Sequence, residues 1–180
     1  MYINIKSTAI DGVKLITPTV YQDHRGFFAQ TYQLAQYQKL LGENEPFVQD
    51  NYSRSNKGVL RGMHFQAQRP QAKLVRCTRG AIFDVVVDLR TDSATFKHWF
   101  GIELTEHNRL QLWVPKGLAH GFLALDDIND VEYKCSDYYH PQSEQTLRWD
   151  DPTIAIEWPQ AEVILSDKDR DGLSWQQLFL

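Results

Sequence analysis

Short β-strand patterns recur along most of this chain, and they constrain its fold more than any other feature. From Phe47 onward, segments rich in β-branched and aromatic residues alternate with polar or glycine-containing breaks. Such spacing is typical of an antiparallel sandwich or barrel, so we expect a mainly β fold with a few short helices. The predicted strands are Phe47–Ser53, Val59–Gln66, Lys73–Thr78, Ala81–Leu89, His98–Leu104, Leu110–Val114, Gly121–Leu125 and Val131–Tyr138.

The segment Ala81–Leu89 shows the period of two most clearly. Phe83, Val85 and Val87 share one face of the predicted strand, and Asp84 shares the other face with Val86. A carboxylate among so many apolar residues is unusual. An inward-facing Asp84 would therefore be a notable feature.

Helical periodicity is limited. Apolar residues recur at helical spacing over Tyr32–Leu41, and Gly42 offers a C-terminal stop. The rest of the N-terminal segment reads as extended, and Leu173–Leu180 reads as a short terminal helix. No linker-like tract or internal repeat divides the pattern, so we predict a single domain over residues 1–180.

Composition excludes several classes of protein. The formal charge is −4, which disfavours a nucleic-acid partner because phosphate polymers require a basic face. No run approaches the roughly 18 apolar residues of a membrane helix, and the start lacks a signal-peptide pattern, so we expect no membrane association and a cytoplasmic location. Cys77 and Cys135 show no metal-ligand spacing and are expected to be reduced core residues.

The segment Pro115–His120 has the Pro-x-Gly-x-x-His form of the second motif of cupin barrels. In cupins the first motif supplies two further histidines as His-x-His, but here the matching place reads His64-Phe65-Gln66. The motifs as written do not assemble three or four metal ligands. We therefore predict a cupin-type barrel that has lost its metal site.

A histidine inside a metal-free barrel suggests proton chemistry. His64 is a natural general base because imidazoles titrate near neutral pH. Its partner would be a carboxylate that fixes the tautomer, and the sequence offers both Asp84 and Asp169. Inversion of a stereocentre also requires an acid on the opposite face of the substrate. The candidate acids are Tyr133, Tyr138 and Tyr139.

Several motifs, in order along the chain, together resemble the dTDP-4-dehydrorhamnose 3,5-epimerase family. They are Asp23-His-Arg25-Gly-Phe-Phe, Phe47-Val-Gln-Asp-Asn51, Val59-Leu-Arg-Gly-Met-His-Phe-Gln66, Lys73-Leu-Val-Arg-Cys, Gly80-Ala-Ile-Phe-Asp-Val, Val114-Pro-Lys-Gly-Leu-Ala-His-Gly-Phe122 and Tyr133-Lys. The resemblance runs from about Val13 to Asp169. It implies a cupin-type double-stranded β-helix (jelly-roll) barrel, no metal or other cofactor, and a homodimer with strand exchange between subunits.

The resemblance also implies roles for individual residues. His64 matches the general base, Asp169 its carboxylate partner and Tyr133 the proton donor, so the family favours Asp169 over Asp84. Tyr138 resembles an aromatic residue that packs near the nucleotide, and Gln30 stands where the family usually carries Glu. The positions that match nucleotide-sugar contacts are Arg25, Gln49, Asp50, Asn51, Arg61, Lys73, His120, Glu144 and Lys168.

The implied reaction inverts both carbons that flank the 4-ketone of dTDP-4-dehydro-6-deoxy-D-glucose, giving dTDP-4-dehydro-L-rhamnose in dTDP-L-rhamnose biosynthesis. The ketone acidifies these C–H bonds through an enolate, so no redox cofactor is needed. Lys73 would hold the oxyanion, and Arg25, Arg61 and Lys168 would hold the diphosphate. Alternatives are a single-centre epimerase, a metal-dependent cupin enzyme, and a non-catalytic sugar-nucleotide binding module.

One spacing conflicts with a regular strand. Arg61 and His64 are three residues apart and would point to opposite faces. Either Gly62 marks a bulge or bend, or Arg61 is directed at another part of the ligand or at the other subunit.

Overall fold

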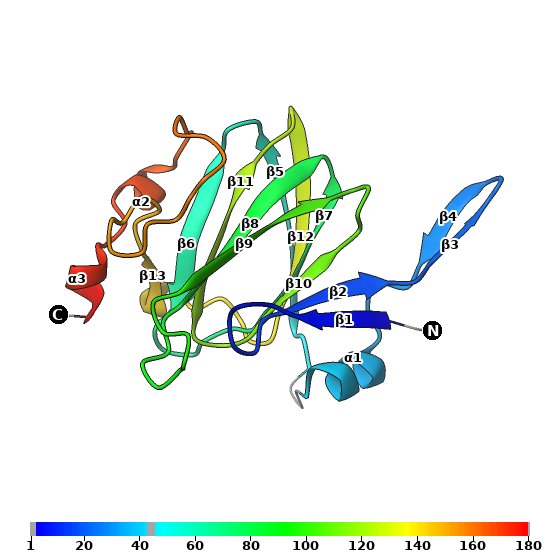
Figure 1. Ribbon diagram of the computed structural model, residues 1–180, viewed down its shortest axis with the longest axis horizontal. Coiled ribbons are helices and arrows are strands. Elements are labelled where there is room, and N and C mark those ends of the chain that lie inside the picture. Colours follow the sequence, from blue (N-terminus) through cyan, green and yellow to red (C-terminus); the bar gives the residue numbers. More distant parts are fainter. Residues whose placement is uncertain (1–2, 43–45, 180) are drawn as a thin grey trace.

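Two antiparallel β-sheets form the body of the protein in a computed structural model that describes residues 3–42 and 46–179 (Figure 1). The six-stranded sheet has the order β1 (Ile3–Ser7), β2 (Lys14–Pro18), β10 (Gln111–Val114), β7 (Lys73–Arg79), β12 (Ile128–Cys135) and β5 (Gln49–Asn56). The five-stranded sheet has the order β13 (Glu144–Thr146), β6 (Leu60–Gln66), β11 (Leu118–Ala124), β8 (Ala81–Asp88) and β9 (Trp99–Thr105).

Apolar side chains from both sheets fill the space between them. Val75 and Val131 from the six-stranded sheet pack in one cluster with Ile82, Val86 and Phe122 from the five-stranded sheet. Each is almost fully buried, and burial of a side chain of this size contributes roughly 1.5–3 kcal/mol. This core fixes the spacing of the sheets on which the site is built.

The five-stranded sheet is buried on its outer face as well. Val85 and Val87 of β8 pack there against Trp175 of the C-terminal segment, which also carries the short helices α2 (Asp167–Arg170) and α3 (Trp175–Phe179). A 3-10 turn, η1 (Pro141–Ser143), precedes β13. Burial on both faces explains why β8 is so apolar, and it leaves Asp84, which is fully buried, on the inner face.

Helix α1 (Leu34–Leu41) covers the outer face of the six-stranded sheet. Its buried Tyr37 packs in a cluster with Ile16 and Trp113. The side chain of Gln33 caps its N-terminus, and Gly42 ends it in a left-handed conformation with φ of 73°. The helix predicted over Tyr32–Leu41 is confirmed, but it begins two residues later, at Leu34.

The hairpin of β3 (Val20–Asp23) and β4 (Gly26–Ala29) projects away from the two sheets, and we call it the β3–β4 arm (Figure 1). Its aromatic side chains are unusually open to solvent. Phe27 and Phe28 are 58% and 60% exposed, and Tyr21 is 50% exposed. Exposed aromatic residues in such a cluster are typical of an interaction surface.

The predicted strands are confirmed, with shifts at their ends. The largest differences are three residues: β5 ends at Asn56 rather than Ser53, and β11 begins at Leu118 rather than Gly121. Strand β12 spans Ile128–Cys135 rather than Val131–Tyr138. Beyond the end of β12, the Ser136 backbone N–H still donates to the Ala72 carbonyl in the register of the β12–β7 pair, and the chain then leaves the sheet. The short strand β13 was not predicted. No helix in the described ranges is long and apolar enough to cross a membrane.

Candidate active site

A cavity of about 400 Å³ lies between the sheets, at the side where β5 ends one sheet and β13 and β6 end the other. Both sheets and α2 contribute to its wall. The lining residues are Gln49, Asn51, Ser53, Arg61, His64, Gln71, Lys73, His120, Phe122, Tyr133, Cys135, Tyr139, Glu144 and Lys168. Most are polar, although the surrounding core is apolar, so the cavity is suited to a polar ligand.

His64 and Asp169 form the first of two imidazole–carboxylate pairs in this region. The Nε2 atom of His64 lies 2.5 Å from Oδ1 of Asp169, although the residues are 105 positions apart. Ser166 caps α2 by accepting the Asp169 backbone N–H and so holds this carboxylate in place. Burial raises the pKa of Asp169, but the bond with His64 and other favourable contacts outweigh it, and the net pKa is lowered.

His120 and Asp84 form the second pair. Nε2 of His120 lies 3.0 Å from each carboxylate oxygen of Asp84, and both side chains are buried. His120 on β11 is paired in register with His64 on β6. From the residues alone, both Asp84 and Asp169 are candidate partners for His64. In the structure His64 pairs with Asp169, and Asp84 pairs with His120.

Lys73 and Tyr133 come from the opposite sheet, on the neighbouring strands β7 and β12. Nζ of Lys73 lies 5.9 Å from the centroid of the Tyr133 ring. Burial lowers the pKa of Lys73 and raises the pKa of Tyr133, since both charged forms lose solvation. The phenol is therefore kept in its protonated form.

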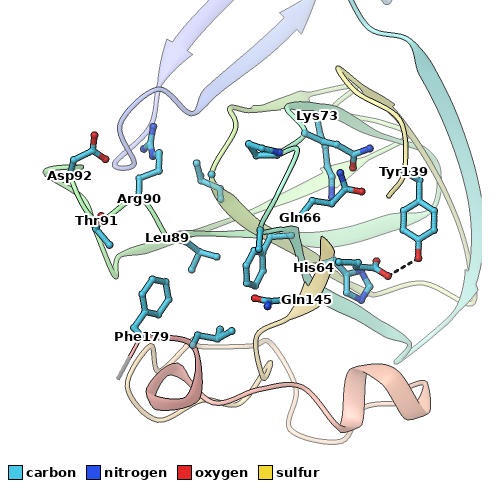
Figure 2. A pocket seen from close by; sticks show the side chains of 18 residues that line it. His64, Gln66, Lys73, Leu89, Arg90, Thr91, Asp92, Tyr139, Gln145 and Phe179 are labelled. Carbon is cyan, nitrogen blue, oxygen red and sulfur yellow. Dashed lines mark hydrogen bonds between the residues drawn. The ribbon is translucent and has the colours of Figure 1, made fainter. Parts of the chain in front are cut away.

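Glu144 links two other residues of the cavity wall, Lys168 and Tyr139. One carboxylate oxygen lies 2.9 Å from Nζ of Lys168, and the other accepts a 2.7 Å hydrogen bond from the Tyr139 hydroxyl, drawn as the dashed line in Figure 2. Burial raises the pKa of Glu144, but these contacts outweigh it and the net pKa is lowered. Helix α2 thus supplies Asp169 to His64 and, one residue earlier, Lys168 to Glu144.

A second cavity of about 430 Å³ adjoins the first (Figure 2). It shares His64, Gln71, Lys73, Tyr139 and Glu144 with the first cavity. Its far end is formed by the loop after β8, which carries Leu89, Arg90, Thr91 and Asp92, and by Phe179 of α3.

A bulge places Arg61 and His64 on the same cavity. Arg61 pairs with Phe122 and His64 with His120, so three steps along β6 match two along β11. Gly62 allows this, because its φ is 142° and a Cβ there would lie 2.6 Å from a backbone atom of the facing strand. Of the two explanations open from the sequence, the bulge is confirmed.

The chain matches known proteins over nearly its whole length. The family model for dTDP-4-dehydrorhamnose 3,5-epimerase matches residues 7–177. The dTDP-4-dehydrorhamnose 3,5-epimerase of Escherichia coli K12 is 50% identical over 179 residues, which cover 98% of this chain and 97% of the relative. The chain belongs to the dTDP-4-dehydrorhamnose 3,5-epimerase family.

Solved structures of the family agree with this assignment. The 3,5-epimerase of Legionella pneumophila Philadelphia 1, in complex with dTDP-4-keto-L-rhamnose, is 50% identical with a TM-score of 0.93 and coverages of 95% of this chain and 92% of that one. The dTDP-4-dehydrorhamnose 3,5-epimerase of Bacillus anthracis Ames, with TDP and pyrophosphate bound, is 43% identical with a TM-score of 0.92 and coverages of 96% and 99%. The predicted mainly β, cupin-type fold is confirmed, and the protein is an isomerase of this family.

Four residues expected at the epimerase site lie elsewhere in this chain. Arg25 and Gln30 belong to the β3–β4 arm and its end, and neither lines either cavity. Asp50 is turned to the other face of β5, where it pairs with Lys134 at 2.7 Å. Tyr138 is 59% exposed, and its neighbour Tyr139 takes the place on the wall.

Sequence reasoning missed several residues of the wall. The period of two would have found three of them: Ser53 follows Asn51 on β5, Cys135 follows Tyr133 on β12, and Phe122 follows His120 on β11. Gln71 lies in a loop, where no periodicity applies. Tyr139, also in a loop, was named from the sequence only as a candidate acid. Within residues 3–42 and 46–179, no group of three His, Cys, Asp or Glu side chains is arranged to hold a metal ion.

Proposed function

We propose that this cavity inverts both carbons beside the 4-ketone of dTDP-4-dehydro-6-deoxy-D-glucose and releases dTDP-4-dehydro-L-rhamnose, by proton transfer alone. The observation that carries the proposal is the placement of a base and an acid on opposite walls. His64 extends from the five-stranded sheet and Tyr133 from the six-stranded sheet, and both line one cavity. Inversion requires this arrangement because the proton leaves one face of the carbon and returns on the other.

His64 is the proposed base. Its Nε2 is engaged by Asp169, which favours the tautomer with the proton on Nε2 and leaves Nδ1 to accept a proton from the substrate. The electrons of the broken C–H bond form the enolate, whose charge rests on the ketone oxygen. Asp169 stabilises the imidazolium that results.

Lys73 is the proposed oxyanion partner, and Tyr133 is the proposed acid. The ammonium of Lys73 would face the enolate oxygen inside a dry cavity, where one such donor is worth about 3 kcal/mol. Tyr133 then gives its phenolic proton to the opposite face of the carbon. The imidazolium and the phenolate return to their starting states by proton exchange with water, and a second round inverts the other carbon.

The remaining polar residues of the wall suit a nucleoside diphosphate. Arg61 and Lys168 would bind phosphate oxygens, since guanidinium and ammonium groups complement them. The other proposed substrate contacts are Gln49, Asn51, His120 and Glu144, all of which line the cavity.

The protein is proposed to work as a homodimer in which each β3–β4 arm completes the partner's site. This would explain why Arg25, Gln30 and the exposed Phe27 and Phe28 lie on a projecting arm rather than at the cavity (Figure 1). Arg25 would then bind the diphosphate held by the partner, and Gln30 would lie near the nucleotide. Asp50 and Tyr138 are turned away from the cavity of their own subunit, and their substrate contacts stay predictions from the resemblance.

Mixing two inactive variants tests the arm. A heterodimer of Arg25→Ala and His64→Ala subunits contains one intact site if Arg25 serves the partner, and none if Arg25 serves its own subunit. We expect refolded mixtures to regain activity that neither parent shows. Mixtures that stay inactive while heterodimers are detected by native mass spectrometry would contradict the exchange.

Metal independence is also part of the proposal. We expect full activity after dialysis against a chelator, with no recovery to be gained from added divalent ions. Activity that is lost and then restored by a metal would point to the metal-dependent cupin alternative. A cytoplasmic location likewise stays a prediction.

The direct test of the reaction is NMR of dTDP-4-dehydro-6-deoxy-D-glucose with the protein in deuterated water. We expect deuterium at both carbons beside the ketone, and an L-rhamno product when a reductase traps it. Exchange at one carbon would indicate a single-centre epimerase. Exchange at neither, with the nucleotide still bound, would indicate a binding module.

A further inference from the structure

Among the described residues, the cavity wall contains a buried hydroxyl, that of Ser53, with no hydrogen-bond partner. Within the described part of the chain, two buried side-chain polar atoms lack a hydrogen bond, Ser53 Oγ and Arg109 Nε. Arg109 has further guanidinium nitrogens besides Nε, and its Cζ lies 4.1 Å from the centroid of the Phe27 ring. Ser53 has only its hydroxyl, and it lines the same cavity as His64 and Tyr133. An unsatisfied buried polar group of this kind is rare unless a water or a ligand completes it.

The neighbours of Ser53 on β5 locate it within the site. Gln49, Asn51, Ser53 and Ser55 share one face of the strand, and Asn51 is paired in register with Tyr133 on β12. Ser55 is satisfied, because its Oγ accepts a 2.9 Å hydrogen bond from Nε of Arg61. Alternate residues of a strand are about 6.5 Å apart, so Ser53 lies midway between the Tyr133 end of the cavity and the Arg61 end.

We propose that Ser53 is a further substrate-binding residue, whose hydroxyl donates a hydrogen bond to an oxygen where the hexose joins the diphosphate. The inference rests on the proposed function, in which the hexose lies between His64 and Tyr133 and the phosphates lie at Arg61. The junction of the two then falls beside Ser53. The acceptor is either an oxygen of the sugar-side phosphate or the hexose hydroxyl next to it, and both present the same chemistry to a serine.

The test compares Ser53→Ala with Ser55→Ala in the full-length protein. Removal of an unpartnered hydroxyl should leave the melting temperature of the ligand-free protein unchanged, whereas Ser55→Ala should lower it by about 2–4 °C, because that variant breaks an existing hydrogen bond. Calorimetry with dTDP and with dTDP-D-glucose, which lacks the 4-ketone, then measures affinity. Loss of the Ser53 hydrogen bond should weaken binding about ten-fold.

The two ligands distinguish the two acceptors. Weaker binding of both dTDP and dTDP-D-glucose by Ser53→Ala supports the phosphate oxygen, and weaker binding of dTDP-D-glucose alone supports the hexose hydroxyl. Unchanged affinity for both ligands overturns the inference, and so does a loss of thermal stability equal to that of Ser55→Ala. If the unmodified protein binds neither ligand, the proposed function fails as well.

Discussion

The histidines of the two imidazole–carboxylate pairs lie side by side in one sheet, yet the pairs differ in how they are held and in how exposed they are. His64 is 25% exposed and its partner Asp169 is 4% exposed, and Asp169 comes from a short helix outside the sheet. His120 is 8% exposed and Asp84 is 0% exposed, and these two residues lie on the adjacent strands β11 and β8. Both imidazoles line the cavity, but that of His64 is more open to solvent, whereas His120 and its carboxylate partner both belong to strands of the sheet.

This difference separates two uses of the same groups. A base must exchange protons with substrate and solvent, so it needs an open ring nitrogen and a carboxylate that only orients it. A pair enclosed by the core cannot exchange protons so readily. Removal of one partner leaves the other as an uncompensated buried polar group. We therefore assign proton transfer to His64, and to His120 a substrate contact whose position depends on Asp84.

The largest expected effect is on the reaction itself. His64→Ala should lower kcat by about 10²–10⁴-fold, because positioned proton transfer contributes that much. Water from the cavity can replace the exposed imidazole, so dTDP affinity and the melting temperature should change little. Steady-state kinetics with a coupled reductase measure kcat. A variant that keeps more than a tenth of the activity would remove the distinction between the pairs.

The next effect is on stability. His120→Ala should destabilise the protein by about 3 kcal/mol, since it leaves the buried Asp84 without its imidazole. Urea unfolding of His120→Ala and His64→Ala compares the two pairs directly. Equal stability of the two variants would show that enclosure in the sheet makes no difference.

A smaller effect is expected from the carboxylate of the open pair. Asp169→Asn keeps the shape of the side chain but removes the charge that stabilises the imidazolium, so kcat should fall about 100-fold while KM stays within about two-fold. The reductase-coupled assay measures both constants. A rise in KM with unchanged kcat would mean that Asp169 serves binding instead of proton transfer.

The smallest effect concerns acid stability. The pKa of Asp169 lies below its ordinary value of 3.8 in the folded protein, because the bonds it accepts outweigh its burial. Its contribution to stability is therefore present above that value and is lost as the pH falls below it. The difference in unfolding free energy between the unmodified protein and Asp169→Asn should shrink as the pH falls below about 4 and the carboxylate is protonated. A difference that keeps growing below about pH 4 would contradict the lowered pKa.

Alternation along the chain was sufficient to predict the strands from Phe47 onward, except β13. His64 could be named as a base from its place in a local motif, whereas most other residues of the cavity wall, Lys73 and Tyr133 among them, were assigned roles by the family resemblance. The choice between Asp84 and Asp169 could not be made from the residues alone. It depends on the packing of α2 against β6, which brings together residues 105 positions apart.

The other differences arise where periodicity fails. The register of β6 shifts at Gly62. The shift is visible only in the pairing with β11, where two residues of β6 lie opposite one residue of β11. After Cys135 the chain leaves the sheet, so the choice between Tyr138 and Tyr139 depends on loop geometry, which alternation does not determine. The β3–β4 arm read as extended, but its direction away from the body is a property of the fold and not of its own sequence (Figure 1).

Deuterium exchange into dTDP-4-dehydro-6-deoxy-D-glucose, followed by NMR for His64→Ala and His120→Ala side by side, tests the central assignment most directly. If His64 is the base for both carbons, His64→Ala loses deuterium exchange at both positions. His120→Ala, studied at a temperature where it is folded, still catalyses exchange at both carbons, but more slowly than the unmodified protein. Exchange that persists in His64→Ala, or that is lost at one carbon in each variant, would contradict the account and divide the chemistry between the two pairs.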